Sequence, residues 1–246
     1  FDISFPEASD PEADDAFAEA LAMYDNVVFP VVGIMENVRR EVTVERGDYI
    51  QAYDIQMPYE LFADKVKLAH INALIDPDGV IRRTVLAIRG PDGTIYPSLA
   101  MNAAQMAGYD TSKYLDNDYM PGNSAKSEIF IKFDALSDEF ITVPFISVLA
   151  GEIDPELFRD AIVLIGITTV GFEFDHRTTT VEKDMKLVYA HGNIINQLMN
   201  GTVARQTEWY VTVGLILILF ASTWWYAWRL KTRSEEHTSE LQSRQY

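Results

Sequence analysis

The sequence predicts an α/β domain, a mixed β-sheet flanked by helices, followed by a transmembrane helix. Along residues 1–205, apolar runs of strand length alternate with segments that carry helix signals at their ends. Beyond them, residues 209–228 (WYVTVGLILILFASTWWYAW) form an uncharged run of twenty residues. A helix of that length rises about 30 Å, the thickness of a hydrocarbon core.

Helices are expected at residues 10–24, 97–108 and 189–200. The first begins with Asp10 as an N-cap before a proline, and acidic residues fill its first turn. The last stops at Gly201, a residue type that commonly ends helices. Their inward faces are expected to include Phe17, Leu21, Tyr24, Ile194, Ile195, Leu198 and Met199.

Strands are expected at residues 1–5, 26–34, 80–89, 128–133 and 161–165, and a more exposed one around Val42 and Val44. The run AIVLI at 161–165 is apolar throughout, which favours a fully buried strand. The turn signals IDPDG and RGPDG stand on either side of the run 80–89. They predict a hairpin at its end.

The charges flanking the run 209–228 give its orientation. Arg229, Lys231 and Arg233 follow it directly, whereas Arg205 and Glu208 before it cancel. Positive residues stay in the cytoplasm, so residues 1–205 are expected outside a bacterial inner membrane. A buried helix of a soluble domain is the alternative, but such a helix rarely runs this long without a charge.

Both ends of the sequence carry an expectation. Residue 1 falls within a strand-like segment, so an upstream membrane anchor and part of the domain are expected to be missing. The string RSEEHTSELQS at 233–243 resembles a translated sequencing adapter. Residues 233–246 are therefore expected not to be native, which the nucleotide record tests.

Composition excludes several classes of function. The formal net charge is −17, and residues 1–208 alone hold 16 Lys and Arg against 34 Asp and Glu, or −18. Such a surface repels phosphate backbones, so no nucleic-acid partner is expected. No cysteine, no HExxH pair and no EF-hand spacing at 116–118 is present, so no catalytic cluster, metal site or cofactor is expected.

Two regions are the better candidates for a ligand site. Polar groups crowd around the IDPDG turn, and hydroxyls follow the run 161–165 at the edge where open α/β sheets bind ligands. The alternative is that the first set only forms the turn and its solvated face, and that His191 has a structural role. The candidate ligand-binding residues are His70, Asn72, Asp76, Arg82, Arg83, Thr168, Thr169, His191 and Asn193.

Four segments together resemble the second family of CHASE domains, which are extracytoplasmic sensors. They are FDISFPEASDPEADDAFAEAL at 1–21, AHINALIDPDGVIRRTVLAIRGPDGTIYPSLA at 69–100, ISVLAGEIDPELFRDAIVLIGITT at 146–169 and AHGNIINQLMNG at 190–201. The order of the segments and the membrane helix that follows them are also similar to the family.

The resemblance implies a sensor and not a catalyst. It implies a receptor that detects a small molecule or another envelope stimulus, works as a homodimer and drives a cyclase or kinase in the cytoplasm. Residues 202–208, a short connection, favour mechanical coupling of the outer domain to the membrane helix. The alternative is an envelope-anchored binding or scaffold module without output, and the gene beyond Lys231 distinguishes the two.

Overall fold

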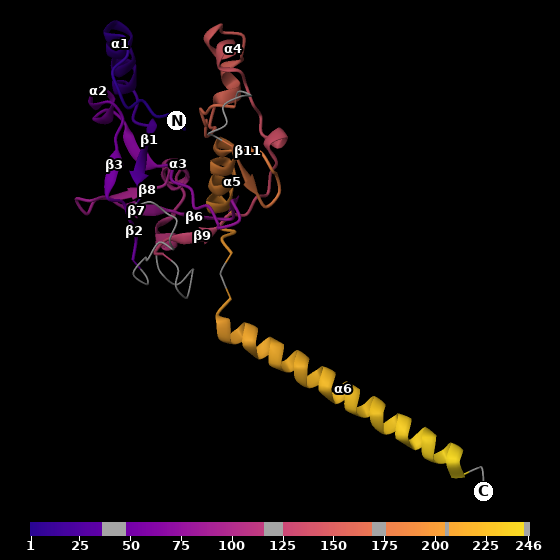
Figure 1. Ribbon diagram of the computed structural model, residues 1–246. Helices are drawn as coiled ribbons and strands as arrows, with labels where there is room; N and C mark the ends of the chain where they lie inside the picture. Colours follow the sequence, from indigo (N-terminus) through magenta and orange to yellow (C-terminus); the bar gives the residue numbers. More distant parts are fainter. Residues whose placement is uncertain (36–47, 116–124, 169–175, 205–206, 244–246) are drawn as a thin grey trace. The chain divides into compact units, whose positions relative to one another are not determined.

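The computed structural model describes residues 1–35, 48–115, 125–168, 176–204 and 207–243, with side chains described as far as residue 230. The chain divides into two compact units, Phe1–Arg205 and Gln206–Tyr246. The first combines small mixed sheets with helices and the second is a single long helix (Figure 1), so the predicted fold class is confirmed.

Helix α1 (Pro11–Ala22) begins where the sequence predicts. The Asp10 side chain accepts a hydrogen bond from the Ala13 N–H at 2.9 Å, and the proline occupies the first turn. Leu21 is buried as expected. Tyr24 was expected on the same face, but it lies beyond the last helical residue and is 62% exposed.

The first sheet surrounds β1 (Val28–Ile34). This strand pairs with β3 (Asp54–Gln56) in antiparallel and with β4 (Lys67–His70) in parallel orientation. Being central, β1 is buried along most of its length, as its apolar run predicts. Aromatic rings fill the space between this sheet, α1 and α2 (Glu60–Ala63), namely Phe1, Phe5, Phe17, Phe29 and Phe62.

The predicted strand 80–89 exists, but it changes partners twice and is therefore three short strands. They are β5 (Val80–Ile81), β6 (Arg83–Val85) and β7 (Ala87–Arg89). Strand β5 runs parallel to β10 (His176–Thr179), which pairs with β11 (Met185–Lys186). Strand β6 pairs with β9 (Glu128–Phe130). Strand β7 lies between β2 (Ile50–Gln51) and β8 (Ile95–Pro97), the latter closing the predicted hairpin.

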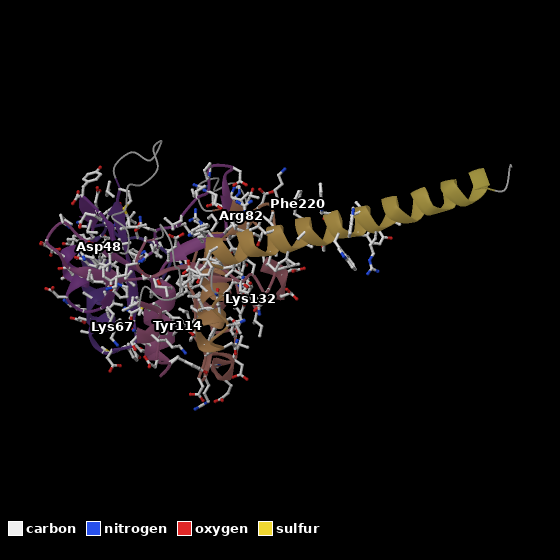
Figure 2. The ribbon with its side chains drawn as sticks, turned by 90° about the horizontal axis from the view of Figure 1, so that it is seen from below. Asp48, Lys67, Arg82, Tyr114, Lys132 and Phe220 are labelled. Carbon is white, nitrogen blue, oxygen red and sulfur yellow. The ribbon has the colours of Figure 1, made fainter. Side chains whose placement is uncertain are left out.

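Helices α3 (Leu99–Met106) and α5 (Leu187–Met199) pack side by side on the other core (Figure 1). Ser98 caps α3, because Pro97 belongs to β8 and not to the helix as predicted. Tyr114 from the 3₁₀ helix η1 (Ser112–Leu115) is 1% exposed within this core (Figure 2). The shorter helices are η3 (Ser137–Glu139), α4 (Phe145–Leu149) and η4 (Pro155–Phe158).

The prediction of a buried strand at 161–165 is wrong. Among the described residues, the run pairs with another segment only at its end, where the Asp2 N–H donates to the Ile165 carbonyl and Asp2 bridges Gly166. Val163 is 48% exposed. An apolar run forms a strand only where a partner strand lies beside it, which composition does not reveal. Val42 and Val44 fall outside the described residues.

Helix α6 (Trp209–Ser243) contains the predicted membrane segment. Trp209–Leu230 is long and apolar enough to cross a membrane, with none of its apolar window buried by the rest of the chain. Phe220, near its middle, is 67% exposed (Figure 2). Arg229 stacks on the Trp225 ring at 4.5 Å, joining the basic exit to the aromatic belt.

Candidate functional site

Three of the predicted ligand residues, Asn72, Arg83 and His191, line one pocket against α5. The pocket has a volume of about 310 Å³ including the open space at its mouth, and its enclosed part has room for about one water molecule. Apolar side chains form most of its wall. The complete lining is Ile71, Asn72, Ala73, Ile81, Arg83, Thr84, Ile131, Leu187, Ala190, His191 and Ile194.

Beside the pocket, the IDPDG turn holds an ionic network. Arg83 bonds Asp76 at 2.6 Å and Glu128 at 2.5 Å, while Arg82 bonds Asp76 at 2.9 Å and Asp78 at 2.8 Å. Burial acts to raise the pKa of Asp76, but the hydrogen bonds from Arg83 and Arg82 outweigh it and lower that pKa. Both arginines are thus engaged by carboxylates of the fold, and Arg83 brings no excess positive charge to the pocket.

Asn72 joins the pocket wall to the end of β1. Its Oδ1 accepts from the Gly33 N–H at 2.8 Å, and its Nδ2 donates to the Gly33 carbonyl at 2.7 Å. A Cβ at position 33 would lie 2.5 Å from the Ile88 side chain and 3.1 Å from Asn72 Oδ1. The amide therefore acts as a strand partner here, and the close approach needs glycine.

Helix α5 is fixed to the segment after β9 by two buried amides. Asn193 Oδ1 accepts from the N–H groups of Asp134 and Ala135, each at 2.9 Å. Gln197 Oε1 accepts from the Lys132 N–H at 2.9 Å, and its Nε2 donates to the Phe130 carbonyl at 2.8 Å. These side chains give the backbone of 130–135 the partners that a neighbouring strand would supply.

Two glycines let other segments approach α5 closely. A Cβ on Gly192 would lie 2.6 Å from the Phe140 ring, and a Cβ on Gly166 would lie 2.8 Å from the Val188 side chain. The Tyr189 ring also packs against Phe140 in a tilted arrangement, with ring centroids 5.2 Å apart. Helix α5 is therefore in tight contact on two sides as well as lining the pocket.

A buried titratable cluster lies behind His191. The Nε2 atom of His191 is 3.6 Å from Oδ1 of Asp2. The His191 side chain is 12% exposed and the Asp2 side chain is 4% exposed. Burial raises the pKa of Asp2 to about 7, against the charge of the Phe1 α-amine. His70 is fully buried; burial and then the charge of His191 lower its pKa to about 3, while the Val85 backbone acts in the opposite direction.

A family model for the CHASE2 domain matches residues 1–227. The chain belongs to the CHASE2 family. The resemblance seen in the four sequence segments is thus confirmed. No curated protein and no solved structure matches the chain.

CHASE2 domains are extracellular sensory domains and not catalytic ones. This family membership places the Phe1–Arg205 unit outside the cytoplasm, and the apolar part of α6 fits a membrane anchor for it. The pocket and the buried cluster are therefore features of a sensory domain. The side chains described hold no group of three or more His, Cys, Asp or Glu arranged to bind a metal ion.

The remaining predicted site residues of this CHASE2 domain lie elsewhere. Asn193 is buried against residues 134–135, and Asp76 and Arg82 lie in the turn network. Thr168 is exposed and does not follow a strand, because 161–165 is not one. Thr169 falls outside the described residues. A ligand role for any of the nine residues stays a prediction.

Sequence reasoning missed three polar residues that organise the site. Glu128 holds Arg83, Gln197 repeats the role of Asn193 one turn later, and Asp2 faces His191. Only Gln197 carried a usable signal, since an amide four residues after another on an otherwise apolar helix face is unusual. Asp2 and Glu128 meet their partners across 189 and 45 residues, and no local pattern reveals such pairs.

Proposed function

We propose that this chain is the sensory part of a bacterial transmembrane receptor in which a small molecule in the α5 pocket controls a cytoplasmic output. The observation that carries this is the position of α5 in the chain. The helix lines the pocket with four side chains, ends at Met199, and is followed after nine residues by α6 at Trp209. A change in α5 thus has a short covalent route to the membrane.

The composition of the pocket indicates the kind of ligand. Its walls are mostly apolar, and Arg83 is already neutralised by two carboxylates. A small, uncharged and largely apolar molecule fits this lining better than an anion, because an anion would compete with Asp76 and Glu128 for Arg83. Such a ligand alters output only if it binds two arrangements of α5 unequally.

On this proposal the basic residues after Trp228 stay in the cytoplasm, at the inner face of the bacterial inner membrane. The output is a class III adenylate or guanylate cyclase, or a kinase, and the receptor works as a homodimer. Both output classes commonly act in pairs, and the short connection between α5 and α6 suits a signal passed between paired helices.

Blocking the pocket tests the proposal in the full-length receptor. Ala73 is exposed at the pocket lining, so Ala73→Trp is expected to obstruct the pocket without disturbing the core. Ala107→Trp, an exposed alanine at the end of α3, is the matched control. The first variant should change the cyclase or kinase activity and the second should not; equal activities in both variants and the wild type contradict the proposal.

An envelope-anchored scaffold is the second candidate, and the surface of α4 favours it. Phe145, Ile146 and Leu149 are 61%, 71% and 68% exposed, and Ile141 beside them is 81% exposed. Apolar patches of this kind often contact other proteins. A gene that stops shortly after Lys231 supports the scaffold, whereas further membrane helices with a cyclase or kinase module support the receptor.

A further inference from the structure

The Asp2–His191–His70 cluster joins three parts of the chain that are distant in sequence. Asp2 belongs to the N-terminal segment, His70 to the end of β4 and His191 to the first half of α5. Asp2 Oδ2 is buried and accepts no hydrogen bond among the described residues, and neither His70 ring nitrogen makes one of ordinary geometry there. Asp2 and His70 are thus enclosed beside His191 with few hydrogen bonds of their own.

We propose that this cluster is a proton-binding latch that holds the N-terminal segment against α5 and releases it on acidification. Asp2 and His191 together are electrically neutral when they hold one proton, wherever that proton resides. Losing it leaves a buried negative charge, and gaining a second leaves a buried positive charge. Both charged states are unfavourable in a site this enclosed, so the contact is tightest at intermediate pH.

The neighbouring groups make the gain of a second proton, at low pH, the step that loosens the contact. His70 is enclosed beside His191. A second proton on the pair therefore places a positive charge next to a neutral imidazole, which cannot compensate it. Two other charged groups lie near the pair, namely the Phe1 α-amine, which bonds the Val28 carbonyl at 2.9 Å, and Arg83 across the pocket. The α-amine is cationic and adds to the repulsion, whereas Arg83 is neutralised by its two carboxylates. Helix α3, which also packs on α5, contributes no charged side chain.

Release has a mechanical consequence for α5. Asp2 bridges Gly166, and Gly166 lies against Val188 one turn before His191. Loosening Asp2 therefore frees the first half of α5 on that side. Asn193 and Gln197 still hold its second half to residues 130–135, so the helix pivots about these amides and is not detached.

The test of proton binding needs neither a ligand nor an output activity, so it does not depend on the proposed receptor. The full chain, in lipid nanodiscs, is labelled on its histidine rings and titrated from about pH 8 to about pH 4 by NMR, the range in which imidazoles change charge. Hydrogen exchange of the amides in α5 is followed over the same range and corrected for intrinsic rates. Histidine resonances are assigned with the His→Gln variants.

The latch predicts that His70 stays neutral throughout, and that exchange in the first half of α5 rises about tenfold or more with the same midpoint as the His191 titration. Asp2→Asn mimics the protonated carboxyl of the neutral pair, so the midpoints of exchange and of the His191 titration should stay together in this variant, and His191→Gln should remove the rise in exchange. His176→Gln, at a histidine in β10 beside the exposed Asp184, is the control that should change neither.

Two results would overturn the latch. One is a rise of exchange in α5 of the wild-type chain whose midpoint differs from that of the His191 titration. This comparison does not depend on the folding of any variant. The other is a rise in α5 exchange on acidification that persists in His191→Gln.

Discussion

Asn193 and Gln197 lie one helical turn apart on α5, and both point buried amides at the backbone of residues 130–135. Each side chain both donates and accepts there. A helix is thus attached to an extended segment by bonds that usually join two strands. This attachment fixes the helix that leads to the membrane, and it makes the two amides the first targets for mutation.

Replacing Gln197 with Leu should destabilise the Phe1–Arg205 unit by about 1–3 kcal/mol, because the Lys132 N–H and the Phe130 carbonyl would lose their partner in a buried place. Asn193→Leu should cost a similar amount for the same reason. Chemical denaturation of the full chain measures both. The exposed neighbour Asn196→Leu is the control, and a loss as large as that of Gln197→Leu would contradict the role of burial.

Gly192→Ala should destabilise the domain by about 1–3 kcal/mol, since its Cβ would lie 2.6 Å from the Phe140 ring. Thermal unfolding compares this variant with Phe140→Leu and with the double variant. The smaller side chain makes room, so the double variant should lose less stability than the two single losses added together. Strict additivity would show that the contact does not limit the approach of Phe140 to α5.

In the turn network, Arg83→Met should cost more stability than Arg82→Met. Arg83 bonds Glu128, whose side chain is 6% exposed, whereas Arg82 bonds Asp78, whose side chain is 54% exposed. Removing Arg83 leaves a buried carboxylate without its cation, at about 1–3 kcal/mol, while an exposed pair contributes about 0–1 kcal/mol. Equal losses in urea denaturation would contradict this ranking.

The pH dependence of stability should show two opposing contributions. The pKa of Asp2 is raised to about 7, so its contribution is present at low pH and is lost as the pH rises to about 7. The pKa of His70 is lowered to about 3, so its contribution is present above the ordinary imidazole range and is lost as the pH falls toward about 3. The two slopes offset each other between about pH 4 and about pH 6.5.

Single variants should separate these slopes. In Asp2→Asn the unfolding midpoint should rise with pH across that interval, because only the His70 contribution remains. In His70→Gln it should fall, because only the Asp2 contribution remains. The slopes are compared and not the absolute stabilities, because replacing the fully buried His70 with Gln itself lowers the free energy of unfolding. Parallel profiles in the wild type and both variants would contradict the assignment.

Local signals predicted much of the fold. Asp10 before Pro11, the glycines at 93 and 201, and the apolar run of β1 each act within a few residues, and each produced the expected cap, turn, stop or strand. The run 161–165 failed because a strand depends on a partner elsewhere in the chain. The run β5–β7 was located correctly but not divided, because its partner strands come from residues 50, 95, 128 and 176 onward.

The site was predictable only in part for a related reason. The polar turn and α5 were each recognisable, yet no pattern in the sequence shows that Arg83 and His191 line one pocket. Asn72 is a candidate from the sequence because it stands among the polar groups near the IDPDG turn, and Asn193 is a candidate beside His191 on the helix, whereas both bond the backbone of the fold. Burial decides between these roles, and burial of a single amide follows from the tertiary structure.

The central claim is that α5 transmits the state of the pocket to α6. Its most direct test is the output activity of the full-length receptor in four forms, with and without Ala73→Trp and with and without four glycines inserted after Thr202. We expect Ala73→Trp to change the activity about fivefold or more in the uninterrupted receptor, and to have no effect once the insertion is present. An equal effect of Ala73→Trp in both backgrounds would contradict transmission through α5.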